Sequence, residues 1–214
     1  MKPFIRDFKE EFISISILLW VILAGQAYCQ HYKIIDPNIH PLINQLSPDI
    51  KGKTLSGKTF DLKDYRGKIL VINVWGLKCI TCYREIVELN ALSEEYRNKN
   101  VTVISLMADS RIDVLEKVKT SGEFYKLYKS HVGNENIDFE IIPDAQPIIA
   151  KFDIEGVPMN FVIDQKGIVR GFSNGYRQVS SIMYESNFVP QQSENYKVLT
   201  KKIEDVIVGD NANR

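Results

Sequence analysis

The sequence lacks an excess of charge of either sign. Its 27 Lys and Arg residues balance 27 Asp and Glu residues, so the formal net charge at pH 7 is zero. Proteins that bind a phosphate backbone need a basic excess, and we therefore expect no nucleic-acid partner. Internal repeats and low-complexity tracts are also missing. With 214 residues, of which 44% are hydrophobic, the chain suits one globular domain with additional segments.

The chain also lacks a hydrophobic run long enough to predict a membrane-spanning helix. The apolar stretch near the N-terminus, residues 13–24, has 12 residues, which as a helix would span about 18 Å of the roughly 30 Å hydrocarbon core. Basic residues precede this stretch and small residues follow it, an order typical of a secretory signal. We predict a signal peptide at residues 1–29, with an uncleaved anchor as the alternative. Export would place the protein in the periplasm or cell envelope.

Beyond the N-terminus, strand and helix patterns alternate. Residues 30–46 are polar and interrupted by prolines, which predicts an extended lead-in. A strand–helix–strand unit follows, and it predicts parallel strands joined by a right-handed crossover. The predicted elements are a hairpin at 52–62, strands at 69–74, 101–107, 139–142, 159–163 and 168–172, and helices from near Thr81 to before Asn100 and at 111–119, 145–152 and 195–208. We assign no role to the long polar segment 173–194.

Cysteine is scarce, and two of the three cysteines form a Cys-x-x-Cys motif, Cys79-Ile80-Thr81-Cys82, where a predicted strand ends and a helix begins. A cysteine at a helix N-terminus faces unpaired N–H groups and the positive end of the helix dipole, which bring its thiol pKa from about 8.5 towards 7. We therefore predict that Cys79 is the nucleophile. Cys82, one turn further along the same face, is predicted to resolve the mixed disulfide. Signal cleavage after Cys29 would leave only this pair, whereas cleavage after Ala27 would leave a third cysteine.

Two other uses of the motif fit the sequence less well. A zinc site would need two further Cys or His ligands, and the three histidines, His31, His40 and His131, are not closely paired. A purely structural disulfide that closes so short a loop would restrict the unfolded chain little. Redox exchange is the better interpretation, and we expect neither a metal nor a cofactor.

Two segments resemble the TlpA-like and ResA-like branch of thioredoxin-fold disulfide reductases. Residues 61–86, DLKDYRGKILVINVWGLKCITCYREI, are similar to the family's cysteine-bearing segment, and residues 156–164, GVPMNFVID, look like its cis-proline segment. The likeness runs from about residue 47 to residue 172. It implies a thioredoxin-like α/β domain over residues 47–214, with a mixed central sheet flanked by helices in three layers and an N-terminal β-hairpin.

The resemblance also implies the residues of the site. Pro158 would be a cis proline facing the cysteines, the backbone of Val157 would pair with an extended substrate, and Trp75 would belong to the same substrate site. Glu85 matches an acidic residue near the buried thiol, where a carboxylate could accept and return the proton of Cys82. The alternatives are a plain strand-initiating proline at Pro158 and, at Glu85, an acid favoured by the helix dipole.

The motif departs from the family at two places. The family usually has Trp before the first cysteine and Pro between the two, where this chain has Lys78 and Ile80-Thr81. The charge of Lys78 is expected to favour the Cys79 thiolate, and a lower thiol pKa stabilises the reduced form. The sequence therefore leaves the direction of net electron flow open.

We expect a protein disulfide reductase that exchanges disulfides with exported client proteins and draws electrons from an upstream membrane donor. The alternative on the same fold is a peroxiredoxin-like thiol peroxidase. Residues 76–78, Gly-Leu-Lys, do not supply the upstream Pro and Thr or Ser pattern of those enzymes. A non-catalytic binding module is disfavoured because both cysteines are intact.

Overall fold

The computed structural model describes residues 40–110, 137–154, 156–174 and 189–212. The predicted signal or anchor, most of the lead-in, the predicted helix at 111–119 and most of the polar segment 173–194 lie outside the described residues. So do Cys29, His31 and His131. Within the described part of the chain, no helix is both long and apolar enough to cross a membrane.

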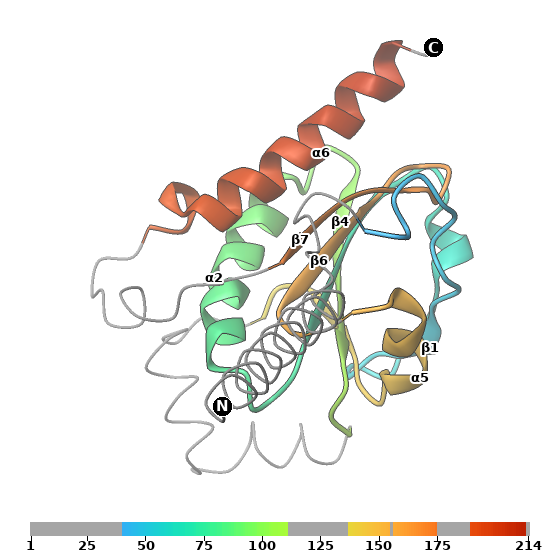
Figure 1. The fold of residues 1–214 in the computed structure, drawn as a ribbon, viewed down its shortest axis with the longest axis vertical. Helices are drawn as coiled ribbons and strands as arrows, with labels where there is room; N and C mark the ends of the chain where they lie inside the picture. Colours follow the sequence, from blue (N-terminus) through green and yellow to red (C-terminus); the bar gives the residue numbers. More distant parts are fainter. Residues whose placement is uncertain (1–39, 111–136, 155, 175–188, 213–214) are drawn as a thin grey trace, which may run out of the picture. The chain divides into compact units, whose positions relative to one another are not determined.

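A mixed five-stranded sheet, in the order β5-β4-β3-β6-β7, forms the centre of the fold (Figure 1). The strand β3 (Ile69–Trp75) pairs in parallel with β4 (Val101–Met107), which pairs in parallel with β5 (Glu140–Ile142). On the other side of β3, β6 (Met159–Ile163) and β7 (Val169–Asn174) are antiparallel to their neighbours. Every residue of β3 is buried, as expected for the central strand of a sheet covered on both faces.

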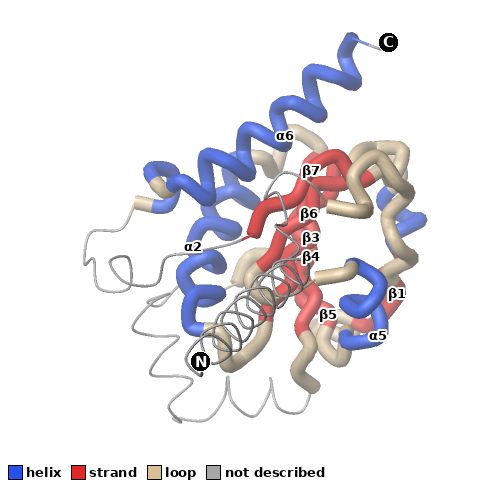
Figure 2. The backbone as a smooth tube through the Cα atoms, viewed as in Figure 1, coloured by secondary structure: helices blue, strands red, loops and turns tan. Residues whose placement is uncertain are grey.

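Two helices, α2 (Ile80–Glu95) and α6 (Glu194–Ala212), cover one face of this sheet, and Figure 2 shows them on the same side of the strands. Their apolar residues pack with every second residue of β3 and β4, because side chains alternate between the two faces of a strand. The strand residues in this cluster include Ile69, Val71, Val101 and Val103.

The opposite face packs against shorter elements. The 3-10 helix η1 (Leu62–Tyr65), the helix α5 (Gln146–Ile149) and the 3-10 turn η2 (Ala150–Phe152) contribute to a second apolar cluster with the alternate residues of the strands. The hairpin β1 (Lys51–Lys53) and β2 (Thr59–Asp61) is antiparallel, as predicted. The thioredoxin-like α/β fold expected from the sequence is confirmed.

Several element boundaries differ modestly from the sequence prediction. The helix predicted at 145–152 divides into α5 and η2, and α6 continues to Ala212 rather than ending at residue 208. The turn between β6 and β7 has Gly167 at a φ of 83°, a conformation that glycine adopts without strain. The described end of the lead-in forms turns and a single bridge between Leu46 and Ile168.

Candidate active site

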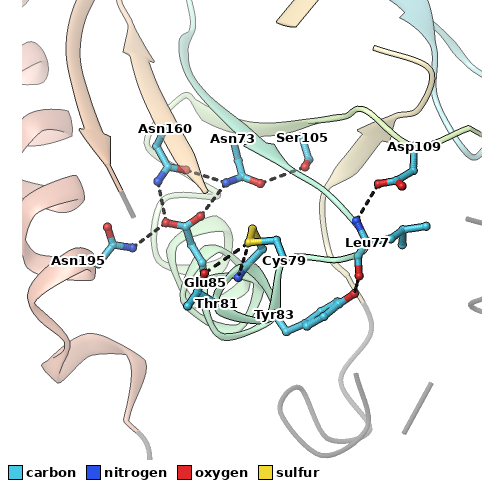
Figure 3. Close-up of a disulfide and its surroundings, with 11 residues drawn as sticks. Asn73, Leu77, Cys79, Thr81, Tyr83, Glu85, Ser105, Asp109, Asn160 and Asn195 are labelled. Carbon is cyan, nitrogen blue, oxygen red and sulfur yellow. Dashed lines mark hydrogen bonds between the residues drawn. A yellow bond between two sulfur atoms is a disulfide. The ribbon is translucent and has the colours of Figure 1, made fainter. Parts of the chain in front are cut away.

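A disulfide joins Cys79 and Cys82 at the N-terminus of α2 (Figure 3). Cys79 is the N-cap residue, and its Sγ accepts a hydrogen bond from the N–H of Cys82 at 3.3 Å. The Cys82 side chain is 1% exposed, whereas Cys79 is partly exposed. One sulfur of the pair can therefore be reached from solvent, and the other is enclosed.

The loop that leads to the disulfide is held from two sides. The N–H of Leu77 donates to Oδ2 of Asp109 at 2.7 Å, and the hydroxyl of Tyr83 donates to the carbonyl oxygen of Leu77. Asp109 follows β4 and Tyr83 lies on α2, so two elements fix the peptide groups flanking Leu77. This arrangement, drawn in Figure 3, restrains the chain two residues before Cys79.

A hydroxyl group lies beside the accessible sulfur. Oγ1 of Thr81 is 3.4 Å from Sγ of Cys79, a hydrogen-bonding distance for sulfur. Lys78, on the other side of Cys79 in the chain, is exposed. A donor and a cation are thus both located next to the position where the reduced form would carry a thiolate.

Glu85 is a buried carboxylate behind the disulfide, one turn after Cys82 and 1% exposed. Its Oε1 accepts hydrogen bonds from Nδ2 of Asn160 at 2.8 Å and of Asn195 at 2.9 Å, and its Oε2 accepts from Nδ2 of Asn73 at 2.8 Å. Burial raises the pKa of Glu85 to about 7, and the charge of Glu88 adds to the rise, while the amide hydrogen bonds oppose it. The carboxyl group can therefore hold or release a proton near neutral pH.

Two of these amides belong to a row of polar side chains that crosses four strands. Oγ of Ser105 donates to Oδ1 of Asn73 at 3.1 Å, and Nδ2 of Asn73 donates to Oδ1 of Asn160 at 3.0 Å. Nδ2 of Asn160 is also 3.3 Å from Oγ of Ser173. Each residue lies directly opposite the next in the strand register. We call these four residues, from β4, β3, β6 and β7, the polar row.

The sequence analysis did not assign a role to the polar row, to Asn195 or to Glu88. One signal was present, because Asn73 interrupts an otherwise apolar strand. A buried amide needs hydrogen-bond partners, so such an interruption indicates a polar neighbour on the facing helix. Asn195 carries no comparable signal, since it stands at the start of an amphipathic helix where polar residues are common.

The residues implied as a substrate site lie at the same end of the sheet as the cysteine loop. The Val157–Pro158 peptide bond is cis, as the resemblance implied, and Val157 is 42% exposed. Pro158 precedes Met159, which pairs with Val74 near the end of β3 from which the loop to Cys79 departs. Trp75 is 2% exposed and belongs to the same buried apolar cluster as Cys82, so it is not a surface residue.

The described residues contain no group of three or more His, Cys, Asp or Glu side chains able to hold a metal ion. His40 lies in the apolar core, where its ring centroid is 5.0 Å from those of both Phe161 and Phe172. That core covers the sheet face opposite α2.

Comparison with known proteins agrees with this geometry. Residues 43–172 match the AhpC/TSA family. The thiol-disulfide oxidoreductase ResA of Bacillus thuringiensis (strain Al Hakam) is 30% identical over 163 residues, which cover 75% of this chain and 87% of that relative.

Solved structures show the same fold. A putative thiol:disulfide interchange protein DsbE from Chlorobium tepidum has a TM-score of 0.58 and 17% identity, covering 77% of this chain and 96% of the other. A mitochondrial 2-Cys peroxiredoxin from Plasmodium falciparum has a TM-score of 0.58 and 20% identity, covering 81% and 98%. The fold alone therefore does not separate disulfide exchange from peroxide reduction. The match of residues 43–172 and the similarity to ResA show that the chain belongs to the AhpC/TSA family of thioredoxin-like proteins and is a thiol-disulfide oxidoreductase.

Proposed function

We propose that the protein works in the cell envelope as a disulfide reductase, exchanging disulfides with exported client proteins through Cys79 and Cys82. The observation that carries this proposal is the unequal exposure of the two sulfurs above a buried carboxylate, Glu85. An accessible sulfur suits attack on a client, and an enclosed one suits release of the client.

The first step is attack by the Cys79 thiolate on a client disulfide. A new bond forms between Sγ of Cys79 and one client sulfur, the client S–S bond breaks, and the other client sulfur leaves as a thiolate. The N-cap position supports the thiolate, because unpaired backbone N–H groups and the helix dipole point at it. The hydroxyl of Thr81, 3.4 Å away, can donate to the same sulfur.

The second step is resolution by Cys82. Glu85 accepts the proton of the Cys82 thiol, the resulting thiolate attacks Sγ of Cys79, and the second client sulfur leaves and takes up a proton. The pair has then lost two electrons to the client and forms the disulfide seen here. Positions 82 and 85 are neighbours on the helix surface, and both side chains are at most 1% exposed. A carboxylate with a pKa of about 7 can both accept and return this proton at neutral pH.

An extended client segment is proposed to pair with the backbone at Val157. This residue is exposed next to the cis Pro158, at the end of the sheet that carries the cysteine loop. Main-chain pairing would accept many client sequences, since it does not depend on client side chains. Trp75, which is 2% exposed, would act by supporting the site rather than by direct contact with a client.

Location in the cell envelope rests on the N-terminal sequence, with its basic residues, apolar stretch and small residues. Expression of the full chain in a bacterial host should yield an exported product that begins between Tyr28 and His31. An intact N-terminus on a cytosolic product would contradict the location. An upstream membrane protein is the proposed electron donor.

The function is tested with the purified domain, dithiothreitol as the electron source and a protein disulfide as substrate. Cys79→Ser should abolish reduction of the disulfide, and full activity in this variant would overturn the assignment. The same preparation should be supplied with hydrogen peroxide. Faster turnover of peroxide than of the protein disulfide would support the peroxidase alternative instead.

A further inference from the structure

Asn195 joins two buried carboxylates. Its Nδ2 donates to Oε1 of Glu85 at 2.9 Å and to Oε2 of Glu88 at 2.7 Å. Glu85 and Glu88 lie on consecutive turns of α2, and their exposed fractions are 1% and 2%. Figure 3 shows Asn195 reaching Glu85 from α6, on the side away from the polar row. Because an amide nitrogen carries two hydrogens, each carboxylate can receive one of them.

Two carboxylates held this close in the protein interior do not titrate independently. Ionisation of one disfavours ionisation of the other, so the first proton binds the pair more tightly than it would bind either group alone. The charge of Glu88 already contributes to the raised pKa of Glu85. The distance between the two carboxylates is therefore a determinant of how basic Glu85 is, and Asn195 is hydrogen-bonded to both of them.

We propose that Asn195 is a positioning residue that holds Glu85 and Glu88 together as one proton-accepting pair, in which Glu85 takes the proton of Cys82. The part played by Cys82 rests on the proposed function, whereas the pairing of the carboxylates does not. The proposal makes α6 a part of the active site, since the helix carries the amide that holds the pair.

The elements around the pair carry further polar and titratable groups. From the sheet, the contacts to Glu85 are the neutral amides of Asn73 and Asn160. The charge of Glu88 also contributes to the raised pKa of Tyr196 on α6. The titratable or charged side chains nearest in the chain are Cys82, Tyr83, Arg84 and Glu94 on α2 and Glu194, Tyr196 and Lys197 on α6.

The pairing is tested by following the side-chain carboxyl carbons by ¹³C NMR during a pH titration of the oxidised protein. Glu88→Gln should lower the midpoint of Glu85 by about one pH unit, because it removes the neighbouring negative charge. Asn195→Ala has two opposed effects on this midpoint, since loss of a donor raises it and release of Glu88 lowers it, so Asn195 is tested through the double variant. Tyr96→Phe is the matched control, since it removes another hydrogen bond between the end of α2 and α6, to Glu204, and should leave the Glu85 midpoint unchanged.

The double variant separates positioning from simple hydrogen bonding. If Asn195 holds Glu88 in place, the shift caused by Glu88→Gln should shrink in the Asn195→Ala background, since the two changes then act on one coupled unit. An undiminished shift in that background, or no shift from Glu88→Gln in the otherwise unchanged protein, would overturn the proposal. Neither measurement requires turnover.

The proposed function is tested separately from the pairing. In the Cys79→Ser background, the alkylation rate of Cys82 should have a pH profile that Glu88→Gln moves to lower pH and Tyr96→Phe does not move. If the carboxyl titrations show the pair but Glu85→Gln leaves the profile of Cys82 unaltered, then the role of Glu85 in the reaction fails while the pairing stands.

Discussion

Replacing Glu85 by Gln should change how the stability of the oxidised protein depends on pH. The pKa of this carboxyl group rises from an ordinary 4.5 to about 7 on folding, chiefly because the group is buried. The folded protein therefore binds the proton more tightly than the unfolded chain does. The resulting contribution to the free energy of unfolding is fully present below pH 4.5 and is lost as the pH rises through 7. Glutamine does not titrate, so the variant lacks this dependence.

The size of the effect follows from the shift. One pKa unit corresponds to about 1.4 kcal/mol, so a rise from 4.5 to about 7 corresponds to about 3 kcal/mol of stability. The free energy of unfolding of the wild type, minus that of Glu85→Gln, should fall by about this amount between pH 4.5 and a pH above 7. The absolute offset between the two proteins is not part of the prediction, because the glutamine amide cannot accept all three hydrogen bonds.

The assay is denaturant unfolding of both oxidised proteins at a series of pH values, without reductant. Glu140→Gln is a control in which the lost contribution to stability should depend on pH in the opposite direction. Partial burial acts to raise the pKa of Glu140, but hydrogen bonds from Lys58 and Ser56 hold it below its ordinary value. Its contribution should therefore be present above pH 4.5 and be lost as the pH falls. If the wild type and Glu85→Gln gave parallel stability curves, the carboxyl group would not have a raised pKa and the argument would be refuted.

Three further predictions concern the disulfide and its loop. Cys82→Ser should accumulate mixed disulfides with client proteins on non-reducing gels, whereas Cys79→Ser should trap few; trapping by the second variant alone would reverse the assigned roles. Thr81→Val should raise the thiol pKa of Cys79, because it removes a donor to the thiolate. The pKa is measured by alkylation across pH in the Cys82→Ser background. An unchanged pKa would remove Thr81 from the mechanism. Asp109→Ala should lower the free energy of unfolding by about 1–3 kcal/mol, because the N–H of Leu77 loses its acceptor, and Asp109→Asn, which retains an acceptor oxygen, should lose less.

The sequence predicted the parts of the molecule that depend on local patterns. Runs of mostly apolar and β-branched residues located β3 and β4, and the Cys-x-x-Cys motif placed Cys79 at a helix N-terminus, where the structure has it as the N-cap. The roles of Cys79 and Cys82 in the reaction stay predictions. Burial of Glu85 could not be read from the sequence, because it depends on contacts between distant segments. Asn195 is 110 residues away from Glu85 along the chain, and no local pattern connects the two.

The polar row also has a consequence for how the sheet assembles. Shifting β6 by one residue against β3 would turn Asn160 to the opposite face, among apolar side chains. The amide would lose its partners, and the carboxylate of Glu85 would lose a donor, each at a cost of about 1–3 kcal/mol. The same hydrogen bonds that set the proton affinity of the site thus also stabilise the correct alignment of β6 against β3. A misaligned sheet would be penalised at the residues on which its chemistry depends, so selection for activity and selection for accurate folding act on the same side chains.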